Sequence, residues 1–230
     1  MKTALAILIL CLCEGVRADE SWQDAFSRMP LGAHVAQLNR TNAIPLMLNA
    51  FQSNRVVKAF IFMPGAADDF VFYRDAHATL TNANPSLADA IVALTNQTGI
   101  HAVFRSPFLI LYTSEDSLDS IITIKSKSLF AKLRKRIVPN HIVLVDCNWD
   151  FVRPKLQNKL SVGLRPFPKA PSSWHIWPGN FAACGVTQWE LLQAIALSTK
   201  TTLTLHWFTA DYVLDDRSGP VQNLNSFPGR

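Results

Sequence analysis

The sequence predicts an α+β fold made of two related units, in which small sheets are covered by helices on one face. Residues 77–113 and residues 180–214 each show the order strand, helix, strand, strand. Strand pairs without an intervening helix favour this class over a doubly wound α/β sheet. The helices of the two stretches are also similar in sequence, Ala90–Thr98 against Ala194–Thr201. This similarity indicates a diverged duplication, with independent repetition of the same helix–strand pattern as the alternative.

The chain begins with the features of a secretory signal peptide. Lys2 is followed by the apolar run Ala4–Cys13, which is too short for a transmembrane helix. We expect cleavage after Ala18; a lipid anchor on Cys13 and an uncleaved anchor are the alternatives. No later run reaches the roughly 18 apolar residues that a membrane span requires. The sequence therefore predicts an exported protein, periplasmic or secreted, with no integral membrane span after cleavage.

The composition is that of a chain that can bury a core. Of the 230 residues, 49% are hydrophobic and 17% are charged, which excludes disorder of the whole chain. The formal net charge of +5 is mildly basic and too small to predict a nucleic-acid partner.

The first half contains two predicted helices before its clearest unit. A short helix is expected over Ser21–Met29, and a second helix, capped by Thr41, extends to Phe51. The apolar and branched run Val56–Phe62 predicts a buried strand. Asp69–Tyr73 is a further strand candidate.

The unit over residues 77–113 carries the strongest local signals. After a strand near His77, Ser86 caps a helix and Asp89 completes a capping box. Gly99 is expected to end this helix with a positive φ. The strands Ile100–Phe104 and Phe108–Tyr112 follow. The apolar face of the helix consists of Leu87, Ala90, Ile91 and Leu94.

The second half repeats these signals. A strand over Asn180–Val186 precedes a helix with Thr187 as its cap and Glu190 at the box position. The strands Thr202–Trp207 and Asp211–Leu214 complete the unit.

These elements define the expected organisation of the chain. We divide it into a signal peptide (1–18), a first unit (19–120), a second unit (121–217) and a disordered tail (218–230).

A basic stretch lies between the two units. It contains six of the 22 Lys and Arg residues, namely Lys125, Lys127, Lys132, Arg134, Lys135 and Arg136. Apolar residues interrupt it at helical spacing: Leu129, Phe130, Leu133 and Ile137. One interpretation is an amphipathic helix whose basic side is merely solvated. The other is a helix that binds anions through Lys132, Arg134, Lys135 and Arg136.

Two cysteines remain after signal cleavage. Cys147 and Cys184 predict one disulfide, with two buried free thiols as the alternative. Cys147 follows a predicted strand and precedes a predicted helix, whose N-terminus favours a thiolate. It is therefore the best candidate nucleophile, with His175 as a base. A thiol hydrolase or peptidase is therefore the alternative function.

Trp174 and Trp177 stand three residues apart between proline-containing segments. They predict an exposed aromatic platform for sugar or peptide, or else the covering of a small core. The six histidines form no metal motif, and no glycine-rich phosphate or dinucleotide loop is present, so we predict neither a metal nor a cofactor.

Residues 77–113 resemble the short N-terminal module of secretins and TonB-dependent receptors. Leu87, Ala90, Ile91, Leu94, Gln97, Gly99 and Ile100 occupy the positions of that family's helix and of the strand after it. The resemblance implies a periplasmic α+β module that binds protein without catalysis. The sequence therefore predicts a non-enzymatic envelope module whose partner is another envelope or secreted protein, or an acidic surface.

Overall fold

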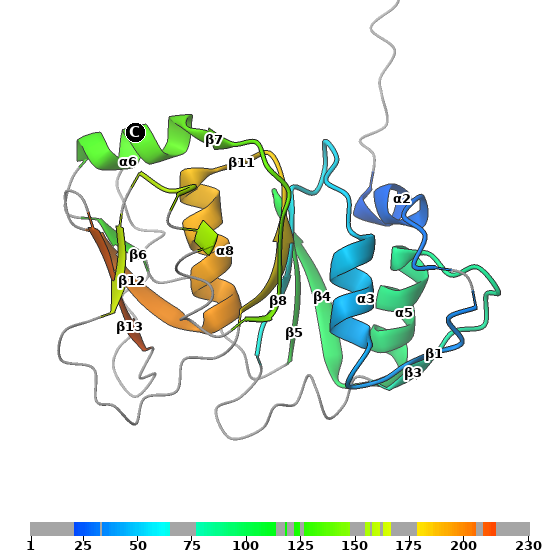
Figure 1. The fold of residues 1–230 in the computed structure, drawn as a ribbon. Coiled ribbons are helices and arrows are strands. Elements are labelled where there is room, and N and C mark those ends of the chain that lie inside the picture. Colours follow the sequence, from blue (N-terminus) through cyan, green and yellow to red (C-terminus); the bar gives the residue numbers. More distant parts are fainter. Residues whose placement is uncertain are drawn as a thin grey trace, which may run out of the picture.

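The computed structural model describes residues 21–32, 34–64, 77–113, 118, 122–124, 127–147, 155–156, 158–161, 163–166, 179–205 and 209–214. Within these ranges the chain forms a mixed α+β structure, which confirms the predicted fold class. Its layers follow the order helices, five-stranded sheet, single helix and four-stranded sheet (Figure 1).

The central sheet has five strands in the order β4-β5-β2-β10-β8. Their bounds are β2 (Ala59–Phe62), β4 (Ile100–Arg105), β5 (Phe108–Thr113), β8 (Ile142–Cys147) and β10 (Gly179–Ala183). Strands β2 and β5 are parallel, and every other neighbouring pair is antiparallel. All residues of β2 and β10 are buried, because both faces of the sheet are covered.

This sheet takes strands from both halves of the sequence. Strand β2 of the first half pairs with β10 of the second, so the expected boundary near residue 120 does not separate two sheets. The hairpins after the two similar helices also pair differently. The first adds its second strand, β5, to β2, whereas both strands of the second have parallel partners elsewhere. The predicted duplication is therefore not confirmed.

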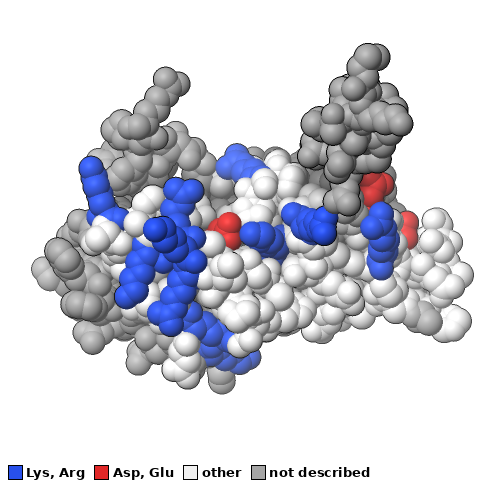
Figure 2. Space-filling model, turned by 90° about the horizontal axis from the view of Figure 1, so that it is seen from above, with Lys and Arg blue, Asp and Glu red and all other residues white. Residues whose placement is uncertain are grey.

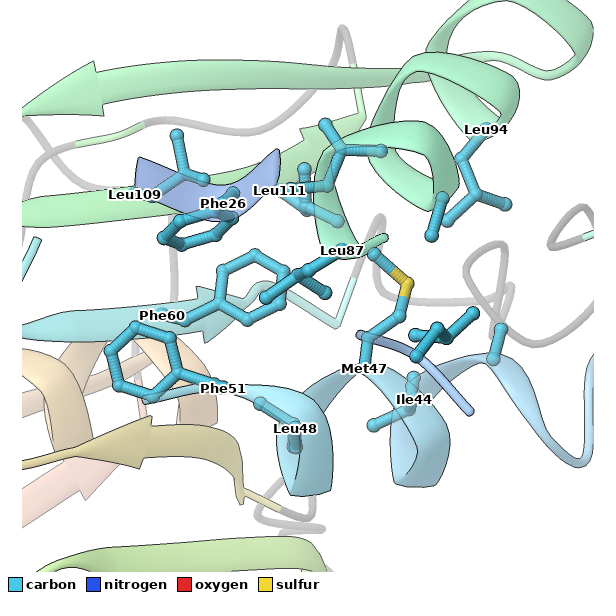
Figure 3. Packing of buried hydrophobic residues seen from close by; sticks show 14 of the residues in the cluster. Phe26, Ile44, Met47, Leu48, Phe51, Phe60, Leu87, Leu94, Leu109 and Leu111 are labelled. Carbon is cyan, nitrogen blue, oxygen red and sulfur yellow. The ribbon is translucent and has the colours of Figure 1, made fainter. Parts of the chain in front are cut away.

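Three helices cover one face of the central sheet: α2 (Trp22–Ser27), α3 (Ala43–Ala50) and α5 (Leu87–Gln97). Phe26 packs edge-on against Phe60 of the sheet, with ring centroids 5.5 Å apart. Figure 3 shows this cluster, in which the helices and the sheet contribute Phe26, Ile44, Met47, Leu48, Phe51, Phe60, Leu87, Leu94, Leu109 and Leu111.

The opposite face of the central sheet packs against α8 (Gln188–Thr199). On the other side of α8 lies the second sheet, in the order β6 (Ile122–Ile124), β12 (Thr201–Leu205), β13 (Thr209–Leu214) and β9 (Gly163–Pro166) (Figure 1). Nine of the 12 residues of α8 are buried, because sheets lie on two sides of it. Apolar residues on more than one side of a helix are typical of such an enclosed position.

The remaining elements lie at the periphery. Helix α6 (Lys127–Lys135) is followed by β7 (Ile137–Val138), which pairs with β11 (Val186–Thr187) just before α8. Strand β1 (Gln37–Leu38) pairs with β3 (Ala78–Thr79) beside the helical layer.

Capping boxes start three helices. The predicted boxes Ser86–Asp89 and Thr187–Glu190 are confirmed, and Ser21–Asp24 forms a third. In α5 the Ser86 backbone N–H donates to the Asp89 carboxylate at 2.7 Å, and the Ser86 hydroxyl donates to it at 2.8 Å. These two hydrogen bonds lower the pKa of Asp89, because they stabilise its charged form.

Two local expectations are wrong. Thr41 does not cap α3: the residue before that helix is Asn42, which makes no side-chain cap bond. Gly99 does not take a positive φ, since α5 ends through an extended Thr98 whose N–H donates to the Leu94 carbonyl. The strand candidate Asp69–Tyr73 and the tail 218–230 lie outside the described residues.

Candidate functional site

Helix α6 is held in place by its apolar side. Leu129 and Leu133 are buried in the cluster that surrounds α8. Phe130 packs edge-on against Trp189 of α8, with ring centroids 4.9 Å apart. At the end of α6 the Arg136 carbonyl accepts a hydrogen bond from the Gln188 N–H at 2.8 Å, so both the helix and its exit are fixed to α8.

The outer side of α6 is basic. We define the basic face as Lys127, Lys132, Arg134, Lys135 and Arg136, all of which are exposed. Within the described part of the chain, none of these five side chains forms an ion pair. Figure 2, which views the molecule from above, shows Lys and Arg side chains gathered over the side where α6 lies. The predicted binding residues Lys132, Arg134, Lys135 and Arg136 therefore lie together.

One member of the face also contacts an aromatic ring, and one neighbour departs from expectation. The Arg134 guanidinium lies over the Phe130 ring, 5.4 Å from its centroid, so this side chain contributes to packing as well as to charge. Ile137, expected on the buried side of the helix, is 61% exposed. The reason is that α6 ends at Lys135 and Ile137 belongs to β7, where it faces outward.

Cys147 is the last residue of β8 and lies at the end of the central sheet away from α6. The residue before it, Asp146, has a φ of 48°, an unusual value for a residue other than glycine. The Asp146 N–H donates to the side-chain oxygen of the buried Asn180 at 2.6 Å. This bond lies at the β-bulge in the β8–β10 pair, which sequence reasoning missed because Asn180 is distant in the chain.

The described surroundings of the Cys147 sulfur contain no general base. Its thiol donates to the Val145 carbonyl at 3.4 Å, and the Lys155 ammonium nitrogen lies 3.9 Å from it. His175, the expected base, lies outside the described residues, as do Trp174 and Trp177. The described part of the chain therefore brings no catalytic pair together.

The predicted disulfide is absent from this structure, in which Cys147 and Cys184 are both free. Cys147 is opposite Gly179 at one end of the β8–β10 pair, whereas Cys184 follows Ala183, which is opposite Ile142 at the other end. At about 3.4 Å per residue the two ends are about 17 Å apart. A disulfide needs Cα atoms within about 7 Å of each other, so the register excludes the bridge.

A polar cleft that the sequence did not indicate lies where β1 and β3 meet the end of α5. Its volume is about 340 Å³, and its lining consists of Gln37, Leu38, Asn39, His77, Ala78, Thr79 and Gln97. The Gln97 side chain accepts from the Thr79 N–H at 2.9 Å and donates to the Thr79 carbonyl at 3.0 Å. Three distant segments form this cleft, so no local motif could have predicted it.

Comparison with known proteins adds no assignment: no protein-family model, curated protein or solved structure matches the chain. The similarity to the secretin and TonB-receptor module thus stays a prediction. Among the described residues there is no cluster of His, Cys, Asp and Glu side chains that could hold a metal ion. No helix in that same part of the chain is both long enough and apolar enough to cross a membrane.

Proposed function

We propose that this protein is an exported, non-enzymatic binding module that docks onto an acidic surface of another envelope component. The observation that carries the proposal is the basic face of α6. Its cations protrude from a packed helix and form no ion pair with the described residues. Such cations create a local positive field that attracts anionic surfaces within a Debye length of about 8–10 Å.

The position of these cations supports binding more than helix stability. Lys132, Arg134 and Lys135 lie in the last turn of α6, where positive charge complements the helix dipole. That effect is worth about 0.3–1 kcal/mol and is confined to the terminal turn. It does not account for Lys127, which begins the same helix and places a fourth cation at the unfavourable end.

The alternative, a thiol hydrolase, has less support. A nucleophilic cysteine needs a base within about 2.6–3.2 Å, or through one water. Among the described residues, the polar groups near the Cys147 sulfur are the Val145 carbonyl and the Lys155 side-chain nitrogen. Neither group is the imidazole that typically activates a nucleophilic cysteine. The hydrolase therefore stays a hypothesis that rests on His175.

A charge-matched pair of variants tests the binding proposal. Lys135→Gln with Arg136→Gln removes two cations of the basic face, whereas Arg40→Gln with Lys155→Gln removes two exposed cations elsewhere. Arg134 is retained because it packs on Phe130. On immobilised polyglutamate, the first variant should elute at lower salt than the second and the wild type.

Neither variant should unfold, because exposed charges contribute under about 1 kcal/mol each to stability. Equal elution of both variants would contradict the proposal. So would a lost thermal transition in the first variant together with unchanged binding, because the helix would then be structural.

Export has a separate test. Sequencing of the N-terminus of the mature protein should begin at Asp19, the residue after the expected cleavage site. A start at a modified Cys13 would show a lipoprotein, and an intact Met1 would show that the apolar run is retained.

A further inference from the structure

Resting on that proposed function, we infer that the acidic surface is a lipid bilayer: the end of the molecule that carries the basic face adsorbs to anionic headgroups. The inference depends on how the cations are distributed and on an exposed apolar side chain among them.

The exposed side of α6 has a small residue between long cations, an arrangement that suits contact with a flat surface. Ala131 is exposed and lies on the side opposite the buried Leu129 and Leu133. Lys127 and Lys135 stand four residues before and after Ala131, so they lie on the same side of the helix along its axis. A small residue between long cations lets the helix approach a plane closely while the cations reach the plane around it.

The cations continue beyond α6 across this end of the molecule. The backbone connects the parts: the Cys184 thiol donates to the Pro139 carbonyl just after β7, and the Cys184 N–H donates to the Lys58 carbonyl. Lys58 ends the loop between α3 and β2, and this loop also carries the exposed Arg55. Figure 2 shows Lys and Arg side chains continuing from the α6 side across the middle of this end, with few acidic side chains between them.

This spread favours a bilayer over a protein partner. An acidic segment of a protein presents its carboxylates at a few places, whereas a layer of anionic headgroups presents charge opposite every cation of an extended end. Each cation near the headgroups then adds to the attraction, which falls off within a Debye length of the bilayer surface.

Ile137 adds an apolar contact within the basic end. It is 61% exposed and directly follows Arg136 of the basic face. An apolar side chain beside cations is suited to the boundary between headgroups and acyl chains. The polar cleft lies at the other end of the molecule, near β1 and β3 (Figure 1).

The test is sedimentation of the mature protein, which begins at Asp19, with vesicles of two compositions. We expect binding to vesicles of phosphatidylglycerol and phosphatidylcholine in equal parts, and at least tenfold weaker binding to phosphatidylcholine alone. The neutral vesicles control for binding that does not depend on headgroup charge. Raising the ionic strength from about 0.01 M to about 1 M shortens the Debye length from about 30 Å to about 3 Å and should abolish the difference.

Variants then locate the surface. Lys135→Gln with Arg136→Gln should weaken binding to the anionic vesicles roughly tenfold or more. Arg55→Gln should weaken it severalfold, and so should Ile137→Ser, whereas Arg40→Gln with Lys155→Gln should leave it unchanged. An Arg55→Gln variant that binds like the wild type would overturn the extended surface.

The polyglutamate experiment separates this inference from the proposed function. Binding to polyglutamate without binding to anionic vesicles would overturn the lipid inference and leave the proposed function standing. Binding to neither would overturn both.

Discussion

Helices α5 and α8 begin alike and lie in different surroundings. Each starts with a capping box and is followed by a hairpin of two strands. Helix α5 buries five of its 11 residues against one face of the central sheet and leaves Val92 46% exposed. Helix α8 buries nine of its 12 residues because it lies between two sheets.

The difference shows that local sequence signals determine where a helix begins along the chain. They do not determine which layer of the fold the helix occupies. The capping box satisfies the first N–H groups of either helix, whatever packs against its sides. Which layer a helix occupies depends instead on the residues outside its apolar stripe, which a helix packed on one side only would expose to solvent. At the positions beyond its apolar stripe, α8 has Ala196 and Ser198, which are small enough to lie inside the molecule.

The largest expected effect comes from truncating a buried side chain of the enclosed helix. Leu192→Ala should lower the free energy of unfolding by about 2–5 kcal/mol, because it leaves a cavity between well-packed layers. Val92→Ala on the exposed side of α5 should stay within about 0.5 kcal/mol. Urea denaturation measures both, and equal effects would mean that α8 is not enclosed.

A second comparison concerns the first residue of each helix. In α5 this residue is the buried Leu87, whereas in α8 it is the buried Gln188. The Gln188 oxygen accepts from the Ser161 hydroxyl at 2.6 Å and from the Ser161 N–H at 3.2 Å, and its nitrogen donates to the Lys159 carbonyl at 2.9 Å.

Gln188→Leu would give α8 the same first residue as α5, and we expect it to destabilise the folded protein. It keeps the volume but leaves the polar groups of Lys159 and Ser161 without partners, which should cost about 1–3 kcal/mol. Chemical denaturation of the variant checks the value. A neutral result would show that water replaces the amide and that the two positions are equivalent.

The caps should behave alike in both helices. Ser86→Ala and Thr187→Ala should each cost about 1 kcal/mol, since each removes the side-chain acceptor of a capping box. Thr41→Ala is the control, because Thr41 does not cap a helix. Thermal unfolding of the three variants would contradict the assignment if Thr41→Ala cost as much as the other two.

The smallest effect is that of pH on the α5 cap. The pKa of Asp89 is lowered in the folded protein, so its charged form stabilises the fold above the ordinary value of 3.8, and this stabilisation is lost as the pH falls through the lower, folded value. Asp89→Asn should therefore be less stable than the wild type at neutral pH, by about 0.3–1 kcal/mol. Denaturation curves at neutral pH and at about pH 3 should show the gap narrowing; a gap that widened in acid would refute the cause.

Local parts of the fold could be predicted from the sequence. The boxes at Ser86 and Thr187 and the hairpin of β4 and β5 depend on neighbouring residues, and the structure has them where the pattern indicated. The pairing of β2 with β10 could not be predicted, because strand partners distant in sequence leave no periodic signal. The separate sheets expected for each half were wrong for that reason.

In the candidate site, too, local features could be predicted from the sequence and long-range ones could not. Helical spacing placed Leu129 and Leu133 inside and the cations of α6 outside, and the structure agrees. Spacing misplaced Ile137, because the helix ends before it. The prediction of a Cys147–Cys184 disulfide was wrong because the number of cysteines does not determine the register of the strands that carry them.

The interleaved central sheet bears on synthesis of the chain. Strand β2 has β5 on one side and β10 on the other, and β10 begins only at Gly179. A nascent chain that has reached the end of β5 therefore carries an apolar strand, Ala59–Phe62, with one edge unpaired. Unpaired apolar edges template aggregation. A chain ending at Thr113 should pellet on centrifugation while the full chain stays in solution, so the first half depends on the last strands for its solubility.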